Sequence, residues 1–454
     1  MRSANPLLGD LAAALVFSSL ALYQLIADAL LFQLGIPYTS AGGSLLVKLH
    51  PGTWVGLLAF VVALAAHGNP VAVLAAALRR HPPLGLWLGA IVFLLGYSIA
   101  RYGPSGAAFL IDTLIMPAVT AVTLLALAPQ RRATAFRLVI GLMLFNAAMA
   151  LVETARHEHF VLYTVGGIEP HEDLFRATAL TGHPLNGALV TGTLAPLLLT
   201  LRIPAGARAL LLGYVVLALL AYGGRTSFLL TLLFLGGYLA LTAAVKLTRG
   251  RFTYAQITGG SVVVLLGIGL LVAVVMGAGL GERIFTKLKV DDSAEVRARI
   301  WSVFGLMSEQ QLIAGASPAE IAHFIFQLAL QDPLETIENF WINMYLQFGA
   351  IGFLPFVAAM VGLLRWLWRL APGPARVSIL IFVVVSSSNN SLSAKGSMLT
   401  TVVAALVCHA SRRRDRRLER RRARRTAAEP GEAAPAGAAG VLPDRCAARP
   451  QAFG

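Results

Sequence analysis

The chain has 454 residues, of which 57% are hydrophobic and 13% are charged, and its mean hydropathy is +0.72. One soluble core does not bury that much apolar surface, so the composition excludes an ordinary soluble protein and predicts an all-α polytopic membrane protein. The only cysteines, Cys408 and Cys446, form no pattern typical of a disulfide framework or a thiolate metal site.

Apolar runs between glycine, proline and basic residues predict twelve transmembrane helices, since a bilayer core requires roughly 20 apolar residues per helix. The first span is expected from Leu11 to Gln33 and is not expected to be a cleaved signal peptide. Residues 1–280 then hold spans one to nine, 281–339 a large loop and 340–410 spans ten to twelve. The span centres lie near Leu22, Phe60, Ile91, Ile115, Met143, Thr193, Leu217, Leu233, Leu266, Phe353, Ile381 and Val403.

The basic residues of the short loops predict the orientation, because cytoplasmic loops carry the excess of Lys and Arg. Thirteen lie on one side of the membrane: Arg79, Arg80, Arg131, Arg132, Arg137, Arg202, Arg208, Lys246, Arg249, Arg251, Arg365, Arg369 and Arg376. Six lie on the other: Lys48, Arg101, Arg156, Arg176, Arg225 and Lys395. Both termini are therefore expected in the cytoplasm of a bacterial inner-membrane protein, with the 281–339 loop in the periplasm.

The C-terminal segment, 411–454, begins with the basic run "SRRRDRRLERRRARR" and continues rich in Ala, Pro, Gly and Glu. The run contributes much of the net charge of +15. A positive-inside anchor against anionic lipid explains it better than a nucleic-acid partner does. The rest of the segment is expected to be a disordered cytoplasmic tail.

The 281–339 loop carries acidic residues and two amphipathic patterns. Nine of the 22 acids lie there, and five more follow the fifth span. The stretch "SAEVRARIWSVFGLM" has helical apolar spacing after a candidate N-cap at Ser293, and "PAEIAHFIFQLAL" predicts a second helix. These helices are expected to form a lid over a cavity at the membrane surface.

Arginines recur at the expected external ends of spans. Arg176 precedes span six, Arg225 follows Gly223 and Gly224 in a very short loop, and Arg297 begins the first lid helix. A single such arginine is typical of an interfacial residue whose side chain reaches the headgroups. Several converging guanidinium groups instead suit a lipid-linked phosphate or diphosphate, which they bind through paired hydrogen bonds.

Four motifs in order, "RATALTGHPLNGALVTG", "GGRTSFLL", "DSAEVRARIW" and "ENFWINMYLQFGAIG", resemble those of the O-antigen ligase and polysaccharide polymerase family. The resemblance covers roughly residues 151–395. It implies a twelve-span glycosyltransferase of the C-type fold that needs no cofactor. Such an enzyme transfers glycan from an undecaprenyl diphosphate carrier to a glycan acceptor in the periplasm. The resemblance also allows other polysaccharide assembly proteins as partners.

One position departs from the family pattern. Ligases of the family have a His before an amide or hydroxyl residue, nine variable residues and a glycine-containing ending, whereas this chain has Glu338 and Asn339 before Gly349 and Gly352. The substitution favours an exopolysaccharide or O-antigen polymerase over a ligase that uses lipid A-core. The expected catalytic residues are Glu338, as the base that takes the acceptor proton, with Arg225 and Arg176 on the diphosphate. The expected substrate-binding residues are Arg297, His183, Asn339 and Lys395.

Other interpretations remain open. Glu338 also suits a helix N-terminus, and His183 suits a helix cap. A transporter or flippase would use the isolated acids Asp28 and Asp112, although no inverted repeat is evident. A non-catalytic assembly subunit is a third alternative. The spacing in "RHEHF" does not favour a metal site on a helix, so no metal is expected.

Overall fold

The computed structural model describes residues 5–39, 44–161, 175–250, 269, 300–329, 337, 339–371, 373–388, 392 and 395–410. Within these ranges the chain is helical and has no strands, as the sequence predicts. Glu338 and Arg297, the Leu266 span and the 411–454 tail lie outside the described residues.

Six helical segments are long and apolar enough to cross a bilayer, which confirms a polytopic membrane protein. They are α1 (Pro6–Leu25), α6 (Pro82–Tyr102), Ala107–Ala126, α9 (Pro129–Arg156), α12 (Arg225–Thr248) and α18 (Phe340–Leu370). The Ala107–Ala126 segment consists of α7 (Ala107–Phe109), the π-helix η2 (Leu110–Ile115) and α8 (Met116–Ala126). A seventh candidate is the pair α4 (Pro51–Ala65) and α5 (Pro70–Arg80), which is bent by 98°.

The other predicted spans of the described part fall on shorter apolar helices. These are α10 (Pro184–Leu194) with the 3-10 helix η4 (Ala195–Thr200), α11 (Ala205–Ala221), α19 (Pro374–Ser387) and a last helix, Met398–Ala410. Each has fewer residues than the roughly 20 that a straight span needs. A total of twelve spans therefore stays a prediction.

The first predicted span differs from the observed helix, because α1 ends at Leu25 and a separate α2 (Asp28–Gln33) follows. Side chains from other helices bind the carbonyl oxygens at this end of α1. Asn146 Nδ2 donates to Gln24 O at 3.0 Å, and His50 Nε2 contacts Ile26 O at 2.7 Å. These bonds satisfy the carbonyls that a longer helix would have paired internally, so the chain can turn here.

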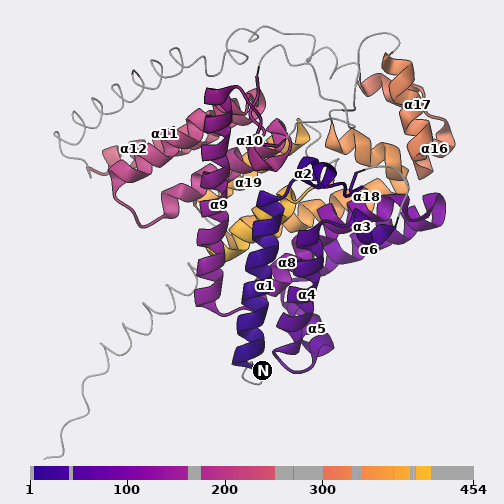
Figure 1. Ribbon diagram of the computed structural model, residues 1–454, viewed down its shortest axis with the longest axis horizontal. Coiled ribbons are helices and arrows are strands. Elements are labelled where there is room, and N and C mark those ends of the chain that lie inside the picture. The colour runs from indigo at the N-terminus through magenta and orange to yellow at the C-terminus, as the bar shows by residue number, and fades with distance from the viewer. Residues whose placement is uncertain are drawn as a thin grey trace, which may run out of the picture. The chain divides into compact units, whose positions relative to one another are not determined.

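Polar contacts join α1 to its neighbours near both of its ends. At one end Asn5 N donates to Ala66 O at 2.8 Å, and Arg131 pairs with Asp10. At the other end Ser19 Oγ donates to Gly52 O at 2.7 Å, which joins α1 to α4 (Figure 1). Most of the Ala107–Ala126 segment is buried between these helices, whereas α12 exposes most of its apolar surface and is suited to face lipid.

The described part of the predicted lid contains η5 (Ile300–Gly305), α16 (Glu309–Ala314) and α17 (Pro318–Ala329). The helix predicted from "PAEIAHFIFQLAL" is thus confirmed as α17, while only a 3-10 turn is described in the preceding stretch. Ile300, Val303 and Phe324 form a small apolar core that includes Ile342 and Leu346 of α18. Tyr97 Oη donates to Ala314 O at 2.6 Å, so the same segment is also attached to α6 (Figure 1).

Gly349, in the glycine-spaced motif, lies where α18 is kinked to meet this segment. Its φ of 54° and ψ of −168° are non-helical, and a Cβ there would overlap the backbone of Ile313 and Gly315. Ala316 N donates to Leu346 O at 2.7 Å, which pairs the two backbones beside the kink. The glycine is required by this close backbone approach.

Replacing Gly349 with Ala is expected to lower the free energy of unfolding by about 2 kcal/mol or more, because the side chain meets both a strained φ and a fixed backbone. Unfolding in SDS-containing mixed micelles measures the change. Gly362→Ala is the matched control on α18, since a Cβ there reaches only Leu86 Cδ2 at 3.4 Å. Equal stability of the two variants would contradict the role assigned to the kink.

Candidate functional site

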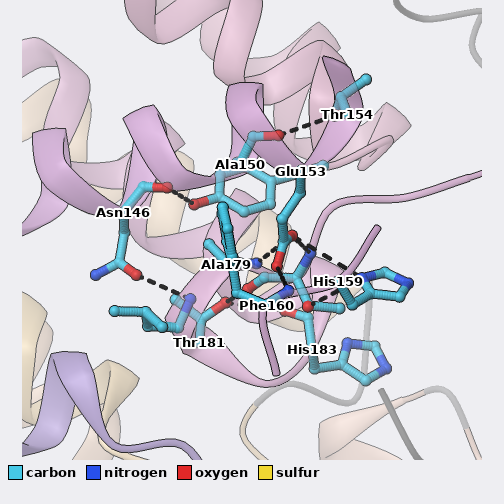
Figure 2. A network of polar contacts seen from close by, with 12 residues as sticks. Asn146, Ala150, Glu153, Thr154, His159, Phe160, Ala179, Thr181 and His183 are labelled. Atoms are coloured by element: carbon cyan, nitrogen blue, oxygen red, sulfur yellow. Dashed lines mark hydrogen bonds and ion pairs between the residues drawn. The ribbon is translucent and has the colours of Figure 1, made fainter. Parts of the chain in front are cut away.

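Glu153 holds the segment that carries Arg176 and His183. Its side chain, near the end of α9, is 0% exposed. Oε1 accepts a hydrogen bond from Phe160 N at 2.9 Å, and Oε2 accepts from Thr178 N and Ala179 N, both at 2.8 Å (Figure 2). Ala179 has a φ of 48°, which is uncommon for a residue with a side chain. A buried carboxylate with three amide donors keeps this turn in place.

Arg176 lies against the turn that precedes Arg225. Ala177 N donates to Ala221 O at 3.0 Å, which joins the two segments through their backbones. Gly223 has a φ of 64°, and a Cβ on it would stand 3.3 Å from Arg176 Cγ. Arg225 is the first residue of α12, and both arginine side chains are half-buried. The structure therefore brings together the segments of two residues that the sequence predicts to act as a pair.

His183 lies beside the same arginine but is neutral. Its Nδ1 accepts from Leu185 N at 3.1 Å, so it caps α10. Burial, together with the charge of Arg176, lowers the pKa of His183 to about 3. At neutral pH His183 can donate a hydrogen bond through Nε2 but adds no positive charge to the cluster.

The other predicted substrate-binding residues have different positions. Asn339 caps α18, with Oδ1 accepting from Trp341 N at 3.0 Å and Ile342 N at 3.1 Å. Lys395 Nζ donates to Tyr38 O at 2.7 Å and lies 4.7 Å from the centre of the Tyr38 ring. Burial lowers the pKa of Lys395 to about 8, although the nearby charge of Asp112 opposes the shift. Asn339 thus has a structural role, whereas Lys395 borders a cavity.

The cavity opens where the break between α1 and α2 meets α10 and the segment before the last helix. Its walls include Gln24, Asp28, Asn186, Tyr222 and Lys395. Lys395 is the only predicted site residue in its lining within the described part of the chain, and Arg176, Arg225, His183 and Asn339 are not in it. Sequence reasoning noted Asp28 and Asp112 only as isolated acids inside apolar runs, and it missed Gln24, Tyr38 and His50.

Asp112 is the centre of a buried hydrogen-bond network on one side of this cavity. It is 1% exposed and lies in the π-helix η2, a type of helical irregularity often found at functional sites. Tyr38 Oη donates to Oδ2 at 2.9 Å, as does His50 N at 3.1 Å. Thr53 Oγ1 donates to Oδ1 at 2.7 Å. The carboxylate therefore connects the first helices of the chain to the Ala107–Ala126 segment.

Asp112→Ala is expected to lower the free energy of unfolding by at least about 3 kcal/mol, because it leaves three buried donors without their acceptor, each at a cost of about 1–3 kcal/mol. Asp112→Asn keeps one carbonyl acceptor and the side-chain volume, so its loss should be clearly smaller. The measurement is again unfolding in mixed micelles. Equal losses in both variants would mean that these bonds do not organise the site.

Neither the protein-family models nor the curated proteins compared with this chain match it.

Proposed function

We propose that the protein is a glycosyltransferase of the bacterial inner membrane that joins glycan units from an undecaprenyl diphosphate carrier to a glycan acceptor at the periplasmic face. The observation that carries this proposal is the backbone hydrogen bond from Ala177 N to Ala221 O, which places Arg176 against the turn before Arg225. Two motifs of the resemblance, remote in sequence, thus meet at the helix ends that also border the cavity.

This pair of segments suits the chemistry of the transfer. As the acceptor hydroxyl attacks the anomeric carbon, negative charge develops on the oxygen of the leaving diphosphate. Guanidinium groups fixed in a water-poor site stabilise that charge, and their planar donors match phosphate oxygens. Glu153 supports the arrangement, because its bonds from Thr178 N and Ala179 N hold the turn that follows Arg176.

Within this class we favour a polymerase of exopolysaccharide or O-antigen over a lipid A-core ligase, because Glu338 stands where ligases of the family have His. In this proposal the chain has twelve spans of a C-type glycosyltransferase fold, both termini in the cytoplasm and the lid in the periplasm. Lipid-linked glycan, a glycan acceptor and the bilayer are its partners.

A transporter of lipid-linked or anionic substrate is the second candidate. It is favoured by Asp112, a carboxylate inside an apolar segment, and by the charge of Lys395 beside it. Against it, the Asp112 oxygens already accept three hydrogen bonds within the fold.

The deciding experiment mixes the purified protein with a synthetic undecaprenyl diphosphate glycan and no nucleotide, then measures product length by gel electrophoresis and mass spectrometry. Growth of the glycan with release of undecaprenyl diphosphate supports the enzyme. Movement of the intact lipid-linked glycan across proteoliposomes, without growth, supports the transporter instead.

The proposed orientation predicts labelling of the lid from outside. In a Cys446→Ser background, Ala319→Cys places a thiol on an exposed residue of α17 and should react with an impermeant maleimide in intact spheroplasts. Ala205→Cys, exposed at the start of α11, is the matched control and should react only after the membrane is opened. The reverse pattern would invert the topology.

A further inference from the structure

Gln24 lines the cavity and has a buried, unsatisfied donor. Its side chain is 6% exposed, and its Nε2 has no hydrogen-bond partner among the residues that the structure describes. The backbone is fixed beside it, because Asn146 Nδ2 donates to Gln24 O. A buried polar group without a partner lowers the stability of the fold by about 1–3 kcal/mol. The unpaired amide of Gln24 therefore indicates a ligand that supplies an acceptor.

Asp28 supplies the complementary group in the same cavity. Its Oδ1 accepts from Ala29 N at 2.9 Å at the start of α2. Gly182 approaches so closely that a Cβ on it would stand 2.5 Å from that oxygen. The turn between Arg176 and α10 therefore packs directly on Asp28, and Thr181 and Asn186 of this region also line the cavity.

The charges of the lining indicate the class of ligand. An anion would meet the carboxylates of Asp28 and Asp112, and a cation would meet Lys395. The remaining polar side chains are amides, hydroxyls and the His50 imidazole. The rings of Tyr23, Tyr38 and Tyr222 add flat surface, and their hydroxyls are hydrogen-bonded within the fold. The side chains of Gln24, Asp28 and Asn186 beside these aromatic walls suit the hydroxyl groups of a neutral sugar ring.

We infer that this cavity is a binding site for a neutral sugar ring, held by Gln24 and Asp28. On the proposed function, on which this assignment rests, the ring belongs to the acceptor glycan, while the Arg176 and Arg225 segments take the diphosphate of the donor. The segment from Arg176 to Asn186 connects the two sites, because it begins at the arginine turn and ends in the cavity wall.

The test uses the oligosaccharide repeat unit released from its carrier by mild acid, which has neither lipid nor phosphate. Its binding to protein in lipid nanodiscs is measured by isothermal titration calorimetry, beside that of inorganic diphosphate. Gln24→Leu and Asp28→Asn should each weaken oligosaccharide binding about tenfold, as expected for one lost hydrogen bond in a buried site, and leave diphosphate binding unchanged. Gln33→Leu, at an exposed amide of α2, is the matched control and should bind like the wild type.

Arg176→Lys should show the opposite selectivity, with weaker diphosphate binding and unchanged oligosaccharide binding. Wild-type affinity for the oligosaccharide in both Gln24→Leu and Asp28→Asn, or no binding by the wild type, would overturn the sugar site even if the enzyme elongates glycan. Oligosaccharide binding that depends on Gln24, without any glycan growth in the transfer assay, would support the sugar site and reject the proposed transferase. Thermal unfolding of each variant checks that the fold is retained.

Discussion

Glu338→Gln is expected to reduce glycan growth by about two to four orders of magnitude, while binding of the lipid-linked donor survives. The amide keeps the size of the side chain and most of its hydrogen bonding, but it does not take the acceptor proton. Glu338 itself lies outside the described residues. Its described neighbours are Ile337, which belongs to the apolar core of the lid segment, and Asn339, which caps α18.

The N-cap at Asn339 helps to separate a catalytic role of Glu338 from a structural one. Since Asn339 Oδ1 already accepts from the first amides of α18, a carboxylate one residue earlier is not needed as the N-cap. A purely electrostatic role at the helix end would cost the Gln variant about 1 kcal/mol of stability or less, with activity retained. Glu338→His should keep partial activity and move the pH profile toward the histidine range. Parental turnover of the Gln variant would remove Glu338 from the chemistry.

Arg176→Lys and Arg225→Lys are each expected to lower turnover by about 10- to 100-fold, because each loses a charge-assisted hydrogen bond worth about 1.5–3 kcal/mol while its charge remains. Both proteins should still insert, since Lys is accepted at a membrane interface as readily as Arg. The assay is glycan growth at fixed protein amount.

Arg79→Lys supplies the control for this pair. Arg79 is exposed in the last turn of α5, among the basic residues expected in the cytoplasm, so its replacement should leave turnover unchanged. Near-normal turnover in both Arg176→Lys and Arg225→Lys would assign these residues to contacts with lipid headgroups.

The helical positions follow from local features of the sequence. Every predicted span centre in the described part falls within a helix, as Met143 does in α9 and Phe353 in α18. The α17 helix also follows from local spacing. Hydropathy and helical periodicity are properties of a few consecutive turns, so the sequence contains them without knowledge of the fold.

The cavity could not be read from the same patterns. The bond from Tyr38 to Asp112 joins residues 74 positions apart, and that from Lys395 to Tyr38 joins residues 357 apart. The break after Leu25 likewise depends on Asn146, which lies 122 positions from Gln24. Such bonds exist only after the helices have packed, and no local pattern specifies which polar groups then face one another.

The sequence by itself therefore determined that this is a membrane protein, because that follows from its composition. It also showed which residue types suit a phosphate, because that follows from side-chain chemistry. Only the tertiary structure decided which of these residues lie close together. Packing placed Arg176 against the turn before Arg225 and made Asn339 the N-cap of α18. It also buried His183 as a neutral helix cap and left Gln24 Nε2 without a partner among the described residues. The physical reason is that burial and hydrogen-bond geometry arise from packing between remote segments.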